Sequence, residues 1–392
     1  MTDFTYPKFE QDSNGIFKLV FKTSLLSFIT LGIYRFWATT RVRQYLWGSL
    51  TIDDDPLEYT GTGMEKLLGF LMAIVILAIY LGLVQFALTF VGLNLTMSDD
   101  PDAAFTQFIS AFISLGAILP LIAFATYRAR RYKMSRTLWR GIRFGMDSAA
   151  WGFVGWWLFY TLIQVVTLGI LTPLKTFRLE KYMADRSYFG SAKVEQGGKW
   201  TELFSAMKHI FIGGGILILA AGLGYADSLA YADSIGFAIF IGVIGYIWLF
   251  VGMIDYGVKS FAYLTSHKTT EGGLALSSEP STSFVIKTTI LMGLALSFIV
   301  SIVFGIVGGI AIGLAALGPI LSVIVIAIAY IGAIAMTEAL GMAWITMPIL
   351  AHYIETSKIA GFENIAEIQQ READSGADAE GFADALDIGG AF

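Results

Sequence analysis

The segment TLGIYRFWATTRVRQY (Thr30–Tyr45) has a counterpart 137 residues later, TLGILTPLKTFRLEKY (Thr167–Tyr182). The two segments share TLGI, an arginine and a closing tyrosine, and the same offset relates Glu65 to Glu202. Each copy begins in an apolar run, passes through a basic stretch and leads into a long apolar segment. A shared order of this length predicts an internal structural repeat, as is common in polytopic membrane proteins.

The composition predicts that this repeat lies in a membrane. Of the 392 residues, 56% are hydrophobic and 15% are charged, whereas soluble domains carry about 25% charged residues. The 50 residues from Thr288 to Thr337 contain no Asp, Glu, Lys, Arg or His. Because a transmembrane helix needs about 20 apolar residues, this stretch alone can hold two spans. The chain has no cysteine, which excludes disulfides and thiolate chemistry.

Long apolar segments are separated by short polar connections. They predict an all-α polytopic protein with about six transmembrane helices in three hairpins. The first two pairs are joined by short acidic turns, and the third by a turn near Gly318. The six segments are Leu67–Asn94, Phe105–Tyr127, Ile210–Ala226, Ile235–Ile254, Thr288–Gly313 and Pro319–Ala351.

Basic loops indicate which ends of these helices are cytoplasmic. Arg128–Arg143 holds seven Lys and Arg residues and Lys175–Lys199 holds six, and short loops rich in Lys and Arg stay in the cytoplasm. Trp151–Leu174 lies between them and is apolar enough to span, yet one span would place one basic loop outside. We therefore expect Trp151–Leu174, and Phe17–Trp37 by the repeat, to be re-entrant or interfacial. Both chain ends are then cytoplasmic.

A smaller pattern recurs at these cytoplasmic ends. In five places a tyrosine closes a helix and a stretch rich in Ser and Thr follows. In four copies a glycine comes eight or nine residues after the tyrosine, and in the first copy Asp-Asp-Asp-Pro takes its place. Glycine and Asp-Pro both form turns, so the pattern predicts short cytoplasmic β-hairpin-like caps. The five tyrosines are Tyr45, Tyr132, Tyr182, Tyr263 and Tyr353.

Two motifs carry a resemblance to a known family. SRTLWRGIRFG (Ser135–Gly145), with its basic lead-in YRARRYKM, and TLGIYRFWATTRVRQYLW (Thr30–Trp47) resemble domain-of-unknown-function family 898, the YjgN-like bacterial inner-membrane proteins. The resemblance covers the chain up to about Gly361. It implies a multi-pass protein of the bacterial cytoplasmic membrane, and it implies no activity and no catalytic residues.

These features divide the chain into five parts. From Glu355 onward there are nine acidic and two basic residues and few bulky apolar groups, a composition that cannot bury enough surface to offset ordering entropy. The predicted parts are a cytoplasmic N-terminal tail (1–16), a first repeat (17–150), a second repeat (151–282), a third helix pair with its cap (283–363) and an acidic disordered tail (364–392).

Three groups of residues are candidates for function. Glu338 lies deep in the last apolar segment, and intramembrane ionisable residues usually face a cavity or a partner; it is either linked to proton or cation movement or a hydrogen-bonded structural group. Arg136, Arg140 and Arg143 either contact anionic lipid or ligand or only mark topology. Gly305, Gly309 and Gly313 form GxxxGxxxG, which packs helices closely, either within the chain or between copies.

Other polar residues have simpler interpretations. Asp255 and Lys259 are spaced for an ion pair along one helix, and His209, His267 and His352 do not have metal-ligand spacing. No nucleophile–base motif is present, so an enzyme is the weakest hypothesis and no cofactor is expected. A transporter or channel for a small solute or ion remains, with a membrane scaffold or assembly factor as the alternative. The expected partners are membrane lipids and other membrane proteins or a second copy, and not nucleic acid.

The topology gives a first prediction. Ser98→Cys should react with an impermeant maleimide added outside intact cells, whereas Ser135→Cys and Ser187→Cys should not, because the acidic turns face out and the basic loops face in. The absence of native cysteine makes each label unambiguous. External labelling of Ser187→Cys without labelling of Ser135→Cys would mean that Trp151–Leu174 crosses the bilayer.

Overall fold

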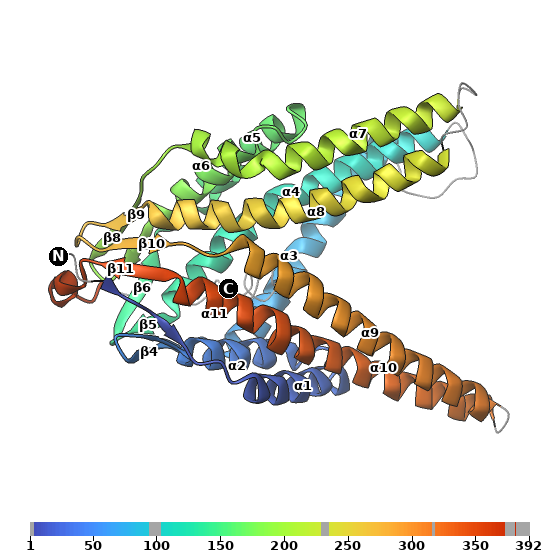
Figure 1. Ribbon diagram of the computed structural model, residues 1–392, viewed down its shortest axis with the longest axis horizontal. Helices are drawn as coiled ribbons and strands as arrows, with labels where there is room; N and C mark the ends of the chain where they lie inside the picture. The colour runs from blue at the N-terminus through green and yellow to red at the C-terminus, as the bar shows by residue number, and fades with distance from the viewer. Residues whose placement is uncertain (1–3, 94–102, 229–234, 316–317, 373–380, 382–392) are drawn as a thin grey trace. The chain divides into compact units, whose positions relative to one another are not determined.

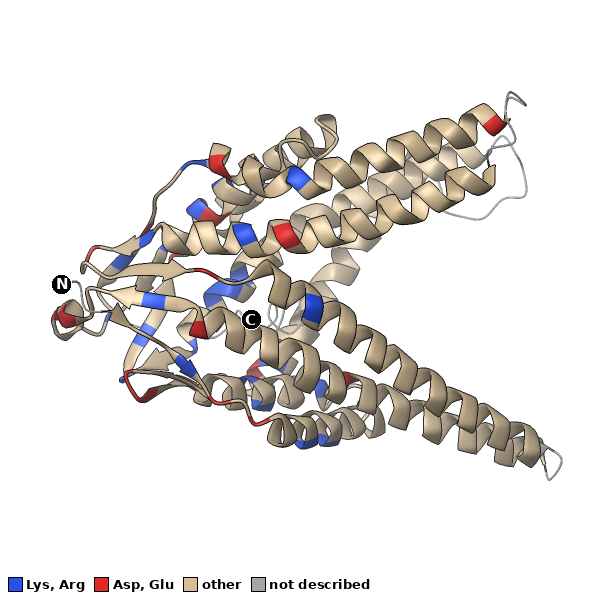
Figure 2. Cartoon of the chain, in the orientation of Figure 1, with Lys and Arg blue, Asp and Glu red and all other residues tan. Residues whose placement is uncertain are grey.

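The computed structural model describes residues 4–93, 103–228, 235–315, 318–372 and 381 (Figure 1). Within these residues six helices are long and apolar enough to cross a membrane, which confirms the predicted number. Lys and Arg lie mainly on the strands, on the short helices and on the helix ends near the strands, while long stretches of α7, α9 and α10 carry no charge (Figure 2). The six spans are Gly63–Phe90, Ala104–Ser135, Trp200–Ser228, Ile235–Ser266, Thr282–Leu314 and Ile320–Glu355.

The helices outnumber the spans because two further pairs of short helices surround the TLGI motifs. The helices are α1 (Ser13–Ile29), α2 (Arg35–Gly48), α3 (Gly63–Phe90), α4 (Ala103–Ser135), α5 (Ala150–Val166), α6 (Thr172–Ala184), η1 (Trp200–Met207), α7 (Lys208–Ser228), α8 (Ile235–Ser266), α9 (Thr282–Ala315), α10 (Pro319–Gly341), η2 (Met342–Thr346), α11 (Met347–Glu355) and η3 (Phe362–Glu367).

Strands correct the predicted all-α class. The predicted caps form hairpins in four of the five places. These hairpins also pair with neighbouring hairpins and build antiparallel sheets. Such pairing is favourable because an unpaired strand edge leaves backbone groups unsatisfied. The strands are β1 (Phe4–Thr5), β2 (Lys8–Phe9), β3 (Leu50–Ile52), β4 (Asp55–Tyr59), β5 (Thr137–Trp139), β6 (Ile142–Met146), β7 (Ser187–Phe189), β8 (Ala192–Gln196), β9 (Lys268–Thr270), β10 (Ala275–Ser278) and β11 (Ser357–Ala360).

The turn residues explain why these short strands reverse where they do. Arg140 and Gly141 both have positive φ, 50° and 75°, as do Asp53 and Asp54, 52° and 63°. Two consecutive positive φ angles are the signature of the type I′ turn, whose twist matches that of a hairpin. The Asp turn is also held by Lys8, whose Nζ lies 2.8 Å from Asp54 Oδ1. This bond raises the pKa of Lys8 and lowers that of Asp54.

Contacts divide the chain into two compact units. The first comprises Met1–Thr30, Ser49–Asp54 and Glu195–Ile365, and the second Leu31–Gly48, Asp55–Val194 and Ala366–Phe392. These units do not follow the predicted repeats at 17–150 and 151–282, because each contains pieces of both. The boundaries of the two repeats therefore remain a prediction.

The second unit has one antiparallel sheet, β4-β5-β6-β7-β8. Strand β6 leads into α5 and strand β7 follows α6, and these two strands pair through Phe144↔Phe189 and Met146↔Ser187. The chain therefore leaves the sheet along α5 and returns to the same sheet along α6. The hairpin packs on α4 through a core of Ala123, Tyr127, Met146, Phe153, Val154 and Leu179.

The tyrosine at the end of a long helix forms a hydrogen bond with the start of the helix that is paired with it. In the second unit, the Tyr132 hydroxyl at the end of α4 donates to Glu65 Oε2 in the first turn of α3, at 2.9 Å. In the first unit, the Tyr263 hydroxyl at the end of α8 accepts from the amide of Lys199, at 2.7 Å, just before η1. Tyr132 and Tyr263 thus join the ends of paired helices.

In the first unit, α7 and α8 pack closely through glycines. A Cβ added at Gly213 would lie 2.7 Å from the backbone nitrogen of Leu249, and one at Gly252 would lie 2.8 Å from the backbone of His209 and Ile210. Real Cβ atoms do not approach backbone so closely, so both positions require glycine. The strands of this unit form a sheet β1-β11-β10-β9 and a ribbon β2-β3.

The two TLGI motifs adopt the same local structure. Leu31 and Gly32 have φ of 51° and 90°, and Leu168 and Gly169 have 50° and 84°. In both copies the preceding threonine hydroxyl donates to the carbonyl four residues back, at 2.8 Å. The motif therefore ends one helix and starts the next, so neither Phe17–Trp37 nor Trp151–Leu174 is one continuous helix.

The predicted acidic tail begins with folded residues. Residues 362–367 form η3, and the amide of Gln369 donates to Ser191 Oγ at 3.1 Å while the amide of Ser191 donates to the Gln369 carbonyl at 2.8 Å. Disorder predicted from residue 364 therefore does not describe its first nine residues. Residues 373–380 and 382–392 lie outside the described part of the chain.

The structure also changes which positions report topology. Ser135 and Ser187 are buried, so cysteines there would resist labelling on either side of the membrane. Ser148 and Glu195 are exposed near the same two basic loops, and Ser228 is exposed at the far end of α7. Ser228→Cys should label from outside, and Ser148→Cys and Glu195→Cys should label only after permeabilisation.

A matched glycine pair tests the α7–α8 contact. Gly252→Ala should lower the thermal unfolding midpoint in detergent, because overpacking of a tight contact costs about 1–3 kcal/mol. Gly309→Ala also removes a helical glycine, but nothing in the described chain lies within 4 Å of its added Cβ, so its midpoint should stay or rise with helix propensity. Equal decreases in the two variants would argue against the close contact.

Candidate functional site

Glu338 lies midway along the apolar helical run Ile320–Glu355. Its Oε2 atom accepts a hydrogen bond from the hydroxyl of Ser24 on α1. Ser24 is only 7% exposed, because α1 packs along α10 in the first unit. The fully buried Ala335 and Ala339 on either side of Glu338 are small enough to allow this approach.

The remainder of the Glu338 side chain is exposed. This differs from an interior position, since one carboxylate oxygen accepts from Ser24 while the side chain as a whole is exposed. Thr337 does not share the contact, because its hydroxyl donates to the Ala333 carbonyl of its own helix at 2.7 Å. Glu338 is thus a carboxylate held on one side and open on the other.

A π-helical turn follows Glu338. It spans Met342–Thr346 and joins α10 to α11. Pro348 near the start of α11 explains it, because proline has no amide hydrogen to donate to the carbonyl of Trp344. The Thr346 hydroxyl donates to the Gly341 carbonyl at 3.5 Å within this turn. π-Turns of this kind are frequent at functional sites, and this one also packs against α1.

The three candidate arginines do not form one anion site. Arg136 Nη2 lies 3.0 Å from Glu65 Oε2, which joins the end of α4 to the start of α3. Arg140 pairs with Asp55 and lies over the Trp139 ring at 4.7 Å. These two arginines therefore have acidic partners within the second unit, and contact with anionic lipid remains a prediction.

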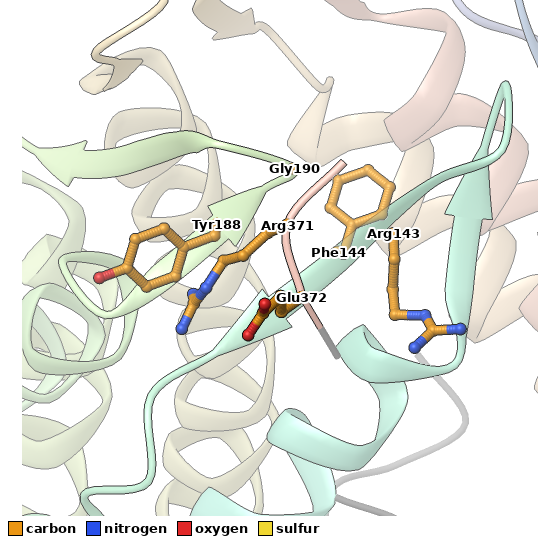
Figure 3. A pocket seen from close by; sticks show the side chains of 7 residues that line it. Arg143, Phe144, Tyr188, Gly190, Arg371 and Glu372 are labelled. Atoms are coloured by element: carbon orange, nitrogen blue, oxygen red, sulfur yellow. The ribbon is translucent and has the colours of Figure 1, made fainter. Parts of the chain in front are cut away.

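Arg143 lies at a different place, beside the C-terminal segment. Its backbone amide donates to Gln370 Oε1 at 2.8 Å. Arg371 stacks over the Tyr188 ring at 4.1 Å and lies 3.5 Å from Asp147 Oδ1. Figure 3 shows the Arg371 guanidinium against Tyr188 and that of Arg143 directed away from it. The pocket between them is lined by Arg143, Phe144, Gly145, Tyr188, Gly190, Arg371 and Glu372.

Comparison with known proteins places the chain in a family. The family described as "Bacterial protein of unknown function (DUF898)" matches residues 7–385. The chain belongs to DUF898. This confirms the resemblance carried by the motifs at Thr30–Trp47 and Ser135–Gly145. No solved structure matches the chain.

Curated relatives of this DUF898 chain carry an inner-membrane name. "Inner membrane protein YjgN" of Salmonella typhimurium is 25% identical over 150 residues, which are 38% of this chain and 33% of that protein. "Inner membrane protein YjgN" of Escherichia coli (strain K12) is 25% identical over 148 residues, which are 38% of this chain and 32% of that protein. The matched segment is therefore about a third of the length of these relatives.

The GxxxGxxxG stripe of the DUF898 chain is open. Gly305, Gly309 and Gly313 are exposed on α9, and an added Cβ at any of them meets no atom of the described chain within 4 Å. The stripe is therefore not a helix contact within the described residues, where the close glycine contacts belong to α7 and α8. An interface between copies stays a prediction.

The remaining polar candidates have local partners. Lys259 Nζ lies 2.7 Å from Asp255 Oδ2, which confirms the predicted ion pair. His267 Nδ1 lies 2.8 Å from the Tyr263 carbonyl, and His352 Nε2 accepts from the amide of Ser281 at 2.8 Å. Among the described residues no group of three His, Cys, Asp or Glu could hold a metal ion.

Proposed function

We propose that this DUF898 chain is a multi-pass protein of the bacterial inner membrane that moves a proton or another small cation, alone or coupled to a small solute. The location is supported by the six apolar spans and by the names of the relatives. The observation that carries the proposed activity is the Glu338 carboxylate at the middle of a span, with Ser24 as its hydrogen-bond donor.

The energetics of Glu338 favour a role in function. An ionised carboxylate at the centre of a membrane helix costs at least about 2.5–3.5 kcal/mol, and one hydroxyl hydrogen bond to a charged group returns about 1.5–3 kcal/mol. The single bond from Ser24 therefore offsets only part of the cost. A carboxylate whose burial cost is only partly offset is suited to binding a cation.

The π-turn supports the same proposal. It begins four residues after Glu338 and is also packed against α1. A π-turn holds the backbone in a wider ring than an α-helix, so it can return to α-helical bonding with a small shift of register. Such a shift would move α11 relative to Glu338 and would change the Ser24 contact. The site would then combine an ionisable group with an adjacent element able to change its local geometry.

A membrane scaffold is the second candidate, favoured by one observation. Among the described residues, no residue in the apolar window of α9 is buried, and a Cβ added on its glycine stripe meets no atom within 4 Å. Helices of this kind fit a surface that contacts lipid or a helix of another protein or a second copy. In a scaffold, Glu338 would be a structural group and its charge state would not matter.

We also propose that both TLGI turns dip into the cytoplasmic side of the bilayer. Leu31 and Leu168 are 94% and 92% exposed and adopt the left-handed conformation, which costs about 1–2 kcal/mol for a residue with a Cβ. Burial of a leucine side chain in hydrocarbon returns about 1.5–3 kcal/mol. Insertion of the leucine into the bilayer therefore offsets the conformational cost of the turn. Exposure of the same leucine to water would not offset it.

The depth of the turn can be measured. A spin label on Leu168→Cys in lipid nanodiscs should be accessible to dissolved oxygen and shielded from a polar nickel chelate, because oxygen concentrates in the acyl region. Ser148→Cys, at the exposed start of the same hairpin, is the matched control and should show the reverse. A label at Leu168→Cys that is fully open to the nickel chelate would show that the turn stays in water.

The role of Glu338 can be measured in sealed liposomes. Protein reconstituted with an internal pH-sensitive dye should dissipate an imposed pH gradient, and Glu338→Gln should reduce that rate at least tenfold, because glutamine keeps the shape and cannot ionise. Glu355→Gln is the control, since Glu355 is an exposed glutamate at the end of the same helical run. Glu338→Gln and Glu338→Leu that both match the wild-type rate would favour the scaffold.

A further inference from the structure

A histidine on one helix completes the cap of another helix in the first unit. Ser281 is the residue before α9, and its hydroxyl accepts from the Phe284 amide at 3.4 Å, as the hydroxyl of an N-cap serine does. The amide of Ser281 itself donates to Nε2 of His352 on α11, at 2.8 Å. In a capping box, this second bond is made by a Glu or Gln three residues after the cap. Phe284 occupies that position here, so His352 supplies the acceptor from a different helix.

Strand pairing brings the two ends of this bond together. β10 and β11 are paired along their whole length, and the amide of Glu279 continues the pairing by donating to the Thr356 carbonyl at 3.1 Å. Pro280 comes next and has no amide hydrogen, so the following donor is the amide of Ser281. His352 precedes Thr356 by about one helical turn on α11, which places its ring beside that donor.

The imidazole ring is also held by stacking. The rings of His352 and Phe284 have centroids 4.4 Å apart and planes inclined by 29°. Because Phe284 belongs to the first turn of α9, the ring that orients His352 and the amide that donates to it lie on the same helix end. The contact between α9 and α11 at this point therefore depends on one side chain in one orientation.

The hydrogen bond requires the neutral form of His352. Nε2 must keep its lone pair to accept from the Ser281 amide, whereas both ring nitrogens of a protonated histidine are donors. Protonation would also place a positive charge at the start of α9, where the helix dipole is positive. Histidine changes charge between about pH 5 and 8. Both effects therefore weaken the same contact when the pH falls through this range.

Few charges act on His352 from the neighbouring elements. α11 packs against η2, α9, β2 and β11, and η2 contains no ionisable side chain. Glu355, on the same helix, is the group whose charge acts on the ring. The ionisable side chains on and beside these elements are Lys8 on β2, Glu279 before α9, Lys287 on α9, Tyr353 and Glu355 on α11, and Lys358 on β11.

We propose that His352 is a pH-sensitive cap on α9. The neutral ring holds the start of α9 to α11 and the protonated ring releases it, while the pairing of β10 with β11 keeps the two segments joined. Because α11 directly follows the π-turn, proton uptake at His352 changes a restraint on the helical run that carries Glu338. The proposal does not rest on the proposed cation activity, since it concerns a contact between two helices.

A spin label in the first turn of α9 tests the cap. Ser283 is exposed and the chain has no native cysteine, so Ser283→Cys can carry a single label in lipid nanodiscs. The label should be restricted at about pH 8, and its mobile component should grow several-fold at about pH 5, because His352 is then protonated. A spectrum that is the same at both pH values would overturn the proposal.

Substitutions of two histidines in the labelled chain identify the group that titrates. His352→Gln keeps an acceptor near the position of Nε2 and cannot be protonated in this range, so the label should stay restricted at both pH values. His352→Leu removes the acceptor and should mobilise the label at both. His267→Gln is the matched control, since His267 is an exposed histidine of the same unit, and it should keep the pH response of the parent chain.

The comparison of the parent with His352→Gln decides the question even where His352→Leu does not fold. A pH response that persists in His352→Gln, or that disappears in His267→Gln, would assign the titration to another group and overturn the proposal. A folded His352→Leu variant whose label stays restricted would overturn it as well, because the cap would then not depend on the histidine.

Discussion

The antiparallel pairing of β6 with β7 is the contact on which the second unit depends. It brings the start of α5 and the end of α6 to one sheet, and both basic loops become part of that sheet. The hairpin must then turn back at Leu168–Gly169, where the left-handed backbone ends α5 and starts α6. The packing of the α5–α6 hairpin on α4 depends on this strand pairing. So does the hydrogen bond that the Tyr182 hydroxyl donates to the Ala149 carbonyl, at 3.0 Å.

Charge and hydropathy patterns predicted the spans, the break at TLGI and several turns, because burial in hydrocarbon and helix termination act on local sequence. The sheets could not be predicted, since each strand is only two to five residues long and pairing joins residues far apart in sequence. The partner of Glu338 was missed for the same reason: Ser24 lies in the first predicted repeat, Glu338 lies in the third helix pair, and a lone serine carries no signal. The burial of Lys66, which is 1% exposed on α3, was also missed, because sequence position does not reveal burial.

Glycines on different membrane helices have different surroundings in the structure. The regular GxxxGxxxG of α9 is open, whereas Gly213 and Gly252, which follow no such motif, bring backbones within contact. The difference arises because close approach depends on what the facing helix presents. At α7 and α8 the opposing surface is backbone, and a side chain of any size would separate the pair. Motif regularity is therefore a weaker guide to packing than the shape of the neighbour.

The closure of β6 on β7 also constrains the order in which the protein is made. β6 ends at Met146 and β7 begins at Ser187, so about 40 residues must be synthesised before the edge of β6 finds its partner, which takes roughly 2–8 s at the usual rate of translation. During that interval α5, with 17 residues, is shorter than the roughly 20 that a span requires. The emerging chain therefore carries an open edge on β6 beside a short apolar helix until β7 has been made.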